Sequence, residues 1–269
     1  MISFAKAFSL AIAMYLLSGC TPPGLDTTPG SASIAPRQDG NQNVAPGGTG
    51  ASRLRPLVLT DNGTEDTVTI ATSIGASVEI WDKPGGAVAS TINATDVLTA
   101  PDATPLVFLV KSQQADWFEV YLPVRPNGST GWVRGSQVTL SGTGLALDVY
   151  LTDHVLVVTK AGVEQARFPV GVGRTDRPTP DGVYYLRELL IPPDPTDLYG
   201  PYAYGLSGYS PVLDSFRGGE AVIGLHGTND PASIGGDVSS GCLRMNNADV
   251  TALVKTYQLP LGTPVYIHE

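Results

Sequence analysis

Cys242 is the residue whose chemistry the sequence indicates most directly. It lies in the segment Ser239-Ser240-Gly241-Cys242-Leu243-Arg244, downstream of His226. A cysteine reacts as its thiolate, and an imidazole within reach can take the thiol proton or hold the thiolate as an ion pair. Because Arg244 adds positive charge, we expect a thiol pKa below its ordinary value of about 8.5. A buried structural cysteine is the common alternative, so spacing alone indicates a nucleophile without excluding a structural role.

The segments around these two residues carry a longer pattern, which extends upstream into the strands before His226. It comprises His226-Gly227-Thr228-Asn229-Asp230-Pro231, Ser233-Ile234-Gly235, Ser239-Ser240-Gly241-Cys242-Leu243-Arg244-Met245, Phe168-Pro169-Val170-Gly171-Val172-Gly173 and Thr179-Pro180-Asp181-Gly182-Val183-Tyr184. Together they resemble the signature of L,D-transpeptidases, the YkuD-type catalytic domain. The resemblance extends from about Leu145 to Ile267.

The resemblance implies a role for each matching residue. Cys242 would be the nucleophile, His226 its acid and base, and the carbonyl of Gly227 would orient the imidazole. Backbone N–H groups would form the oxyanion hole, and two further side chains would bind substrate or brace a loop. The oxyanion residues are Ser240, Gly241 and Cys242, and the substrate-binding candidates are Arg244 and Tyr202.

Ser240 departs from the family pattern, which usually has a histidine immediately before Gly-Cys. The family's base is the upstream histidine, so the resemblance still assigns that role to His226. A residue before Gly-Cys contributes mainly a backbone N–H, which Ser240 retains. We therefore expect an active enzyme.

The implied reaction is acyl transfer on peptidoglycan stem peptides, which cross-links the cell wall and needs no cofactor. An amine on a second stem would resolve the thioester, and carbapenems would acylate the same thiol. Two alternatives stay open. Water could resolve the thioester, giving an L,D-carboxypeptidase, or the chain could be a non-catalytic wall-binding lipoprotein.

Composition excludes other classes of function. With 16 Lys plus Arg against 25 Asp plus Glu, the net charge is −9, whereas a nucleic-acid binder needs a basic face. A zinc site needs three or four ligands, but the chain has three histidines and, once Cys20 is set aside, one cysteine. We expect neither a metal nor a nucleic-acid partner.

The elements that position these residues are mostly strands. Residues 142–269 are predicted to form the catalytic domain, starting with strands at Leu145–Leu151, Val155–Thr159 and Val163–Val170, joined as an antiparallel meander. Val250, Leu253, Val254 and Tyr257 follow helical spacing after Asn246 or Asn247 as N-cap, and Val265–His268 closes the sheet.

Residues 56–141 are predicted to form a small barrel. Alternating runs predict strands at Thr67–Thr72, Ala76–Trp81, Leu106–Lys111, Trp117–Val124 and Gly131–Arg134, with an Asn127-Gly128 turn before the last of them. The stretch from Trp117 to Val133 resembles bacterial SH3-like modules of wall enzymes, some of which bind wall peptides. Packing of the three tryptophans in the barrel core or against the next domain is the alternative that we favour.

The first 55 residues suggest export. Residues 1–19 resemble a lipoprotein signal peptide, because a short apolar run ends in Leu17-Ser18-Gly19-Cys20. Cys20 would carry the lipid, and residues 20–55 would form a flexible tether. We expect an exported protein, anchored through Cys20 to the outer face of the cytoplasmic membrane or in the periplasm.

The predicted fold class is therefore mainly β. An SH3-like small barrel precedes a β-rich, sandwich-like catalytic domain with one C-terminal helix. Residues 141–144 read Ser-Gly-Thr-Gly, which predicts an exposed joint that few contacts cross.

Overall fold

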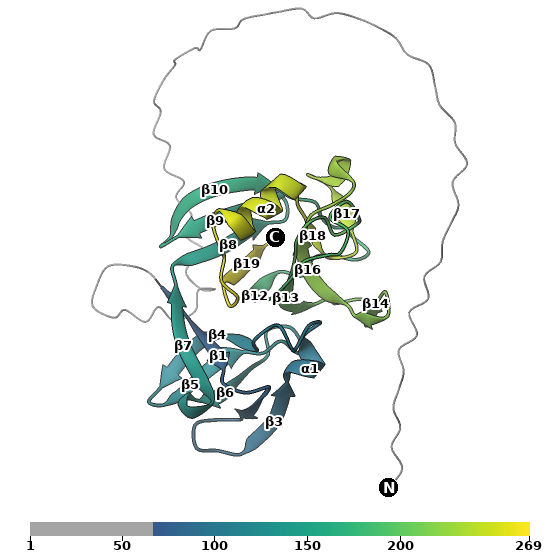
Figure 1. Cartoon of the computed structure of the whole chain (residues 1–269). Coiled ribbons are helices and arrows are strands. Elements are labelled where there is room, and N and C mark those ends of the chain that lie inside the picture. Colours follow the sequence, from purple (N-terminus) through teal and green to yellow (C-terminus); the bar gives the residue numbers. More distant parts are fainter. Residues whose placement is uncertain (1–66) are drawn as a thin grey trace, which may run out of the picture. The chain divides into compact units, whose positions relative to one another are not determined.

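The computed structural model describes residues 67–269, so the expected signal segment 1–19, Cys20 and the tether 20–55 lie outside the described residues. The described residues fall within one compact unit. Strands predominate and helices are few, which confirms the expected mainly β class (Figure 1). Within residues 67–269, no helix has the length and apolar character needed to cross a membrane.

The N-terminal part is a seven-stranded antiparallel sheet with strand order β3-β2-β6-β5-β4-β1-β7. All five strands expected here are present, but β3, α1 and β7 were not expected. The sequence of β3 gave no alternating signal, because its first four residues are all exposed. The elements are β1 (Val68–Ser73), β2 (Ser77–Trp81), β3 (Val88–Asn93), α1 (Ala94–Val97), β4 (Val107–Gln114), β5 (Trp117–Tyr121), β6 (Thr130–Arg134), the 3₁₀ helix η2 (Gly135–Gln137) and β7 (Val138–Thr143).

The tryptophans of this sheet do not form its core. Trp81, Trp117 and Trp132 are half-buried, while the buried cluster consists of aliphatic side chains with Phe108 and Phe118. Trp81 and Trp117 meet edge to face, with ring centroids 5.2 Å apart, beneath the guanidinium of Arg134. The expected core position is therefore wrong. A wall-binding role for an SH3-like module stays a prediction.

The C-terminal part is an eight-stranded sheet with order β10-β9-β8-β19-β12-β13-β16-β18. The expected meander is confirmed as β8–β9–β10, and β19 joins β8 in parallel. The expected helix is α2, with Asn246 at its N-cap position. The elements are β8 (Leu145–Tyr150), β9 (Val155–Lys160), β10 (Val163–Pro169), β11 (Val172–Gly173), β12 (Gly182–Leu190), β13 (Ala203–Tyr209), β14 (Ser215–Phe216), β15 (Gly219–Glu220), β16 (Val222–His226), the 3₁₀ helix η3 (Pro231–Ser233), β17 (Asp237–Ser239), β18 (Leu243–Arg244), α2 (Asn247–Lys255) and β19 (Pro264–His268).

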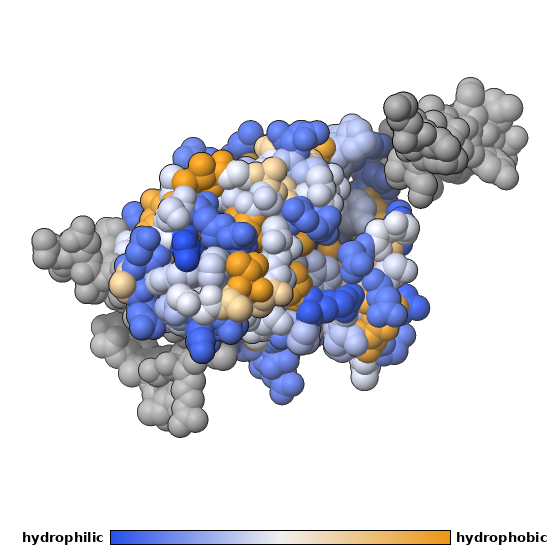
Figure 2. Space-filling view, turned by 90° about the horizontal axis from the view of Figure 1, so that it is seen from below, coloured by the Kyte–Doolittle hydropathy of each residue, from blue (hydrophilic) through white to orange (hydrophobic). Residues whose placement is uncertain are grey.

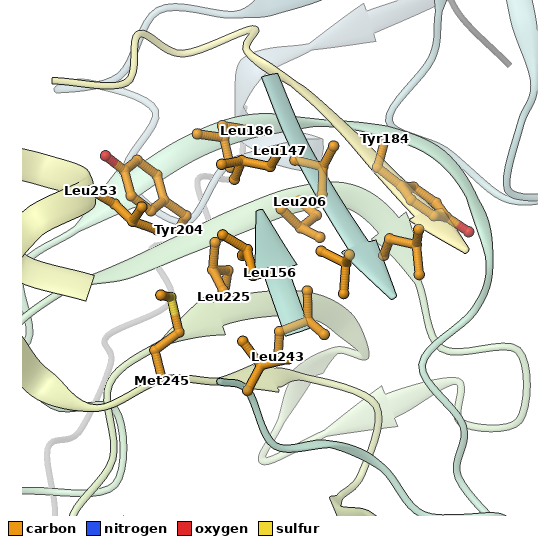
Figure 3. Packing of buried hydrophobic residues seen from close by; sticks show 14 of the residues in the cluster. Leu147, Leu156, Tyr184, Leu186, Tyr204, Leu206, Leu225, Leu243, Met245 and Leu253 are labelled. Atoms are coloured by element: carbon orange, nitrogen blue, oxygen red, sulfur yellow. The ribbon is translucent and has the colours of Figure 1, made fainter. Parts of the chain in front are cut away.

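The core of this sheet is built from alternate residues of its central strands (Figure 3). Side chains two residues apart share a face of a strand, so β12 and β13 each turn a tyrosine and a leucine inward. Leu225 of β16 and Leu253 of α2 belong to the same cluster, so the helix packs on the sheet that carries His226. Register shifts in β10, β12 and β13 interrupt the ladder and increase its local twist, as bulges do. The sheet is curled like half a barrel.

Contacts between the two sheets are more extensive than the sequence predicted. Ile70, Val107 and Leu109 of the N-terminal sheet share a buried cluster with Tyr185 of β12. Hydrogen bonds also cross between the sheets, for example from the Thr99 backbone N–H to Glu188 Oε2 at 2.8 Å. The expectation of few contacts across residues 141–144 is therefore wrong. Tertiary packing joined side chains that are distant in sequence, which local composition does not reveal.

Candidate active site

His226 ends β16 with its side chain on the face opposite the hydrophobic core. Val222, Gly224 and His226 share this face by strand alternation, while Leu225 turns into the core. The neighbouring strand β13 places Ala203 beside His226 and Gly205 beside Gly224. Small residues on both strands therefore leave open space over the sheet next to the imidazole.

Cys242 sits in a tight loop between β17 and β18 that hydrogen bonds hold closed. The Ser239 hydroxyl accepts the Gly241 N–H at 3.0 Å and donates to the Cys242 carbonyl at 2.6 Å. The buried Thr179 hydroxyl donates to the Gly241 carbonyl at 2.8 Å. Gly241 has φ +118°, and a Cβ there would lie 3.0 Å from Ile223 Cδ1, so only glycine fits. The Thr-Pro-x-Gly motif thus braces the cysteine loop.

The parallel pairing of β16 with β18 brings this loop beside His226. Leu225 lies opposite Leu243 and His226 opposite Arg244 in the register. A Cβ added to Gly224 would lie 3.6 Å from the Cδ2 of His226 and 3.7 Å from Cys242 Sγ. Both groups therefore border the same small space above Gly224. The sequence-predicted pair is brought together here.

The imidazole of His226 is fixed and neutral. Its Nδ1 lies 2.6 Å from the Gly227 carbonyl, so this nitrogen carries the hydrogen and Nε2 is left as the acceptor. Burial is the main cause that lowers the pKa of His226; the bond to Gly227 opposes it, the nearby Arg244 adds to it, and the net result is a pKa of about 4. The Tyr199 ring meets the imidazole edge to face, with centroids 4.9 Å apart. The imidazole is therefore poised as a base at neutral pH.

The loop that follows His226 is held by Asn247. Its side-chain oxygen accepts the Thr228 N–H at 2.8 Å, which ties the first turn of α2 to the segment carrying the Gly227 carbonyl. From the sequence, Asn247 is only a possible N-cap of the helix. No side-chain capping bond is formed by Asn246, which occupies that position.

The thiol of Cys242 does not follow the expected direction of pKa shift. Burial raises the pKa of this thiol, against weaker opposing effects of the Gly224 N–H and of Arg244. The Gly224 N–H donates to Sγ at 3.4 Å. The expected low pKa is therefore wrong. Burial destabilises the thiolate, because it removes the charge from water, by more than the positive charge of Arg244 stabilises it. The resting pair is a neutral thiol and a neutral imidazole.

Arg244 lies beside both groups and retains hydrogen-bonding capacity. Its backbone exchanges two hydrogen bonds with Gly171, at 2.8 and 2.9 Å. Its Nε is buried and has no hydrogen-bond partner within the described residues. The side chain also borders the small hollow beside Ser240 and Cys242. The backbone braces the loop while the guanidinium remains free to bind an anion.

The three expected oxyanion donors differ in availability. The Gly241 N–H already donates to the Ser239 hydroxyl. Among the described residues, no hydrogen bond uses the N–H of Ser240 or of Cys242. The Ser240 hydroxyl accepts from Arg177 at 3.3 Å, so it points to a surface arginine. The Gly241 N–H is therefore not available to an oxyanion, and the N–H groups of Ser240 and Cys242 are the two remaining donors.

Tyr202 does not occupy the substrate-binding position expected from the sequence. Its ring packs against the hydrophobic core and lies 5.6 Å from the Lys255 ammonium. Tyr199, three residues earlier, contacts His226 and borders both hollows around Cys242. The expectation is corrected to Tyr199, because the Gly200-Pro201 turn reverses which of the two rings faces the site.

Two hollows meet at Cys242 and His226. The smaller borders Ser240 and Arg244. The larger is a cleft of about 680 Å³, within the usual range for ligand sites, and it extends from Cys242 past Glu188 to residues 96–99 of the N-terminal part. A reacting group at the thiol can therefore be approached from two directions.

Comparisons with known proteins match the C-terminal part of the chain to one family. Residues 145–267 match the model of the family described as the L,D-transpeptidase catalytic domain, YkuD. The protein of Bacillus subtilis strain 168 named "Putative L,D-transpeptidase YkuD" is 37% identical over 101 residues, covering 38% of this chain and 52% of that protein. Its namesake in Bacillus licheniformis is 34% identical over 131 residues, covering 49% and 64% respectively.

Solved structures include L,D-transpeptidase 3 from Mycobacterium tuberculosis, which is 14% identical with a TM-score of 0.40, over 61% of this chain and 92% of that one. The same enzyme in complex with a faropenem-derived adduct is 17% identical, with a TM-score of 0.41 over 61% and 91%. This chain spans about half to two thirds of the two Bacillus relatives. Over residues 145–267, the chain is therefore similar to the catalytic domain of the L,D-transpeptidase YkuD family.

Proposed function

We propose that this protein is a peptidoglycan L,D-transpeptidase whose nucleophile is Cys242 and whose base is His226. The observation that carries the proposal is the space above Gly224, which the imidazole edge and the thiol sulfur both border within 4 Å. Nucleophilic catalysis by cysteine requires a base within reach of the thiol, itself oriented by a third group. The Gly227 carbonyl serves as that third group.

Proton transfer accompanies the attack in this proposal. Because both groups rest neutral, Nε2 of His226 takes the thiol proton as sulfur bonds to the carbonyl carbon of the donor peptide. The amide C–N bond then breaks, and the imidazolium returns the proton to the departing amine of the terminal D-residue. The product is a thioester on Cys242 with the imidazole neutral again.

Charge on the substrate is met by two groups. The free N–H groups of Ser240 and Cys242 support an oxyanion hole for the tetrahedral intermediate. The buried Nε of Arg244, which lacks a partner in the described part of the chain, is suited to a substrate carboxylate. The oxyanion hole would stabilise the transition state, and Arg244 would orient the peptide.

The second half-reaction decides between two enzymes. An amine of another stem peptide attacking the thioester gives a cross-link, and water gives an L,D-carboxypeptidase. Either nucleophile would lose its proton to His226 while the C–S bond breaks and the thiol re-forms. We propose the amine, because the wide cleft beside the thiol has room for a second peptide.

The location of the protein is part of the proposal. Residues 1–19 would direct export, and Cys20 would carry the lipid that retains the enzyme at the cell envelope. Replacing Cys20 with Ala should release the protein from membranes while its activity stays intact. Unchanged membrane retention of that variant would disprove the anchor.

The test of function is mass spectrometry of tetrapeptide muropeptides incubated with the purified protein. Cross-linked dimers are the expected product, whereas trimmed monomers would mean a carboxypeptidase. If the wild-type protein leaves the substrate unchanged, the proposed enzymatic activity is wrong and a wall-binding role is favoured. Cys242→Ala should abolish turnover, and Cys20→Ala, which removes the other cysteine, is the matched control.

A β-lactam gives an independent readout of the nucleophile. One solved relative is described with a faropenem-derived adduct, and we propose that Cys242 attacks carbapenems in the same chemical sense. The expected mass increase equals one drug, because the sulfur adds to the carbonyl and the ring opens without loss of atoms. The adduct should form on Cys20→Ala and not on Cys242→Ala.

A further inference from the structure

The cleft beside Cys242 is bordered by the C-terminal sheet and by a segment of the N-terminal part. Its lining includes Gly224, Glu188 and Arg217 of the C-terminal part together with residues 96–99, which include the end of α1. Much of the lining is apolar, and its charged groups are of both signs, namely Asp96, Arg187, Glu188, Arg217 and Glu220. Such a lining suits an extended peptide that has apolar side chains and charged ends.

Glu188 fixes residues 96–99 against the catalytic sheet. Its carboxylate is buried and accepts three hydrogen bonds, two of them from Thr99. The Thr99 backbone N–H donates to Oε2 at 2.8 Å, the Thr99 hydroxyl to Oε1 at 3.1 Å, and Arg187 to Oε1 at 3.1 Å. Glu188 also packs against Gly205, where a Cβ would lie 2.9 Å from its side chain. The contact therefore connects the N-terminal sheet to the floor of the cleft.

A second connection runs from the loop at 123–127 to the segment before the hairpin β14–β15. Arg125 donates to the Ser210 carbonyl at 2.7 Å and to the Leu213 carbonyl at 2.8 Å. The Asn127 amide pairs with the backbone of Tyr209, donating at 2.8 Å and accepting at 2.9 Å. This pairing extends β13 by side-chain hydrogen bonds in place of a strand.

The hairpin that follows lies at the thiol. Its turn residues Arg217 and Gly218 both have positive φ, as a two-residue type I′ turn requires. Phe216 borders both hollows around Cys242, and Glu220 lies 3.7 Å from the Arg125 guanidinium. An isolated two-stranded hairpin is marginally stable, so its position depends on such anchors.

We propose that the N-terminal sheet is a structural part of the active site. Residues 96–99 form one wall of the peptide-binding cleft, and the 123–127 loop holds the hairpin β14–β15 in place over the thiol. Arg125, Asn127 and Thr99 are positioning residues for substrate and do not touch the reacting atoms. This inference rests on the proposed function and assigns part of its substrate site to the other sheet.

The test uses substitutions in the full chain, with KM, kcat and the rate of Cys242 alkylation by iodoacetamide as readouts. Loss of these hydrogen bonds in Arg125→Gln and Asn127→Ala should raise KM for a tetrapeptide about tenfold, with kcat nearly unchanged. Thr99→Val should raise KM about threefold, because its backbone bond to Glu188 remains. Alkylation, which needs only the thiol, should proceed at the wild-type rate.

Matched controls come from the same sheet. Lys83→Gln removes an exposed charge from the turn between β2 and β3, and Thr139→Val removes an exposed threonine hydroxyl of β7. Both should leave KM and kcat unchanged. If Arg125→Gln unfolds, Arg125→Lys keeps the charge near Glu220 but cannot bond both carbonyls, and should give an intermediate KM.

Two results would overturn the inference. One is a KM within twofold of wild type for both Arg125→Gln and Asn127→Ala. The other is alkylation that slows in parallel with turnover, which would mean that the thiol itself was disturbed. If wild type neither turns over nor is acylated, the proposed function fails instead. Calorimetry can then still measure the affinity of the tetrapeptide for Cys242→Ala, with and without Arg125→Gln. Equal affinities would refute the inference that the N-terminal part contributes to peptide binding.

Discussion

The two sheets differ in what they bury. The buried polar residues of the N-terminal sheet are threonines, whereas Asp148, Arg187, Glu188 and His226 are all buried in the C-terminal sheet. Burying a charge is costly unless it is paired and hydrogen-bonded, so a sheet that buries several needs a dense set of partners. The residues of the proposed chemistry and the groups that are costly to bury therefore lie in the C-terminal sheet. The N-terminal part supplies supporting contacts at the border between the two.

The surfaces of the two parts do not show this contrast, because single apolar side chains are exposed on both. The face in Figure 2 is mostly hydrophilic, and its hydrophobic residues form small separate patches. Exposed apolar side chains such as Ile74 and Leu140 of the N-terminal part are the kind of scattered exposure that any soluble domain shows. The half-buried tryptophans and Arg134 remain the candidate wall-binding surface there.

The largest expected effect is on the buried base. His226→Ala should lower kcat by roughly 10²-fold or more, as removal of a general base does. His154→Asn is the control, since His154 pairs with Asp237 outside the site and asparagine tolerates its φ of 53°. A loss as large in the control would mean that the effect does not depend on the position of His226 beside the thiol.

The pH dependence follows from the same group. Because burial lowers the pKa of His226 to about 4, the folded state binds this proton less readily than the unfolded state. The contribution of His226 to stability is then fully present above about 6.5, the unfolded pKa, and is lost as pH falls toward 4. We expect kcat/KM without an acidic limb between pH 7 and 5. An acidic limb near 6.5 would show that the imidazole titrates normally.

The next prediction concerns the unfolding free energy that is lost when one ion pair of each sheet is broken. Glu188→Ala removes the partner of buried Arg187 and should cost about 3 kcal/mol or more of unfolding free energy. Lys111→Ala breaks the Lys111–Glu119 pair, whose lysine is 42% exposed, and should cost at most about 1 kcal/mol. Urea unfolding of both variants measures the difference. Equal costs would remove the contrast between the sheets.

A smaller effect concerns two glycines. A methyl group in Gly224→Ala would occupy the space between the imidazole and the thiol at ordinary contact distances, so kcat/KM should fall about tenfold while the fold is kept. Gly75→Ala, in the turn between β1 and β2, would meet only the Ser77 carbonyl at an ordinary 3.9 Å, and should change activity little and stabilise slightly. Full activity of Gly224→Ala would show that the transfer does not pass through this space.

The smallest effect tests the departure from the family pattern. Ser240→Ala keeps the backbone N–H and loses only the contact with the Arg177 side chain, so turnover should change by less than about threefold. Steady-state rates beside those of His226→Ala decide the point. Damage equal to that of His226→Ala would give the serine hydroxyl a catalytic part.

The sequence by itself determined the mainly β class, most strands, the C-terminal helix and the pairing of Cys242 with His226. These depend on local signals, since alternation predicts strands and a spaced motif marks a reactive thiol. It failed at β3, whose exposed residues lack alternation, and at the tryptophans, because periodicity does not reveal which face of a strand is covered.

Only the tertiary structure decided the electrostatics of the site and what surrounds it. The raised thiol pKa comes from burial, which depends on neighbours distant in the chain and outweighs the adjacent Arg244. Likewise, the ring of Tyr199 contacts His226, whereas that of Tyr202 does not, and the Gly241 N–H donates to the Ser239 hydroxyl. Both outcomes depend on the conformation of a loop, which the sequence pattern does not specify. The bonds from Thr99 to Glu188 join residues 89 positions apart, a pairing that only the folded chain creates.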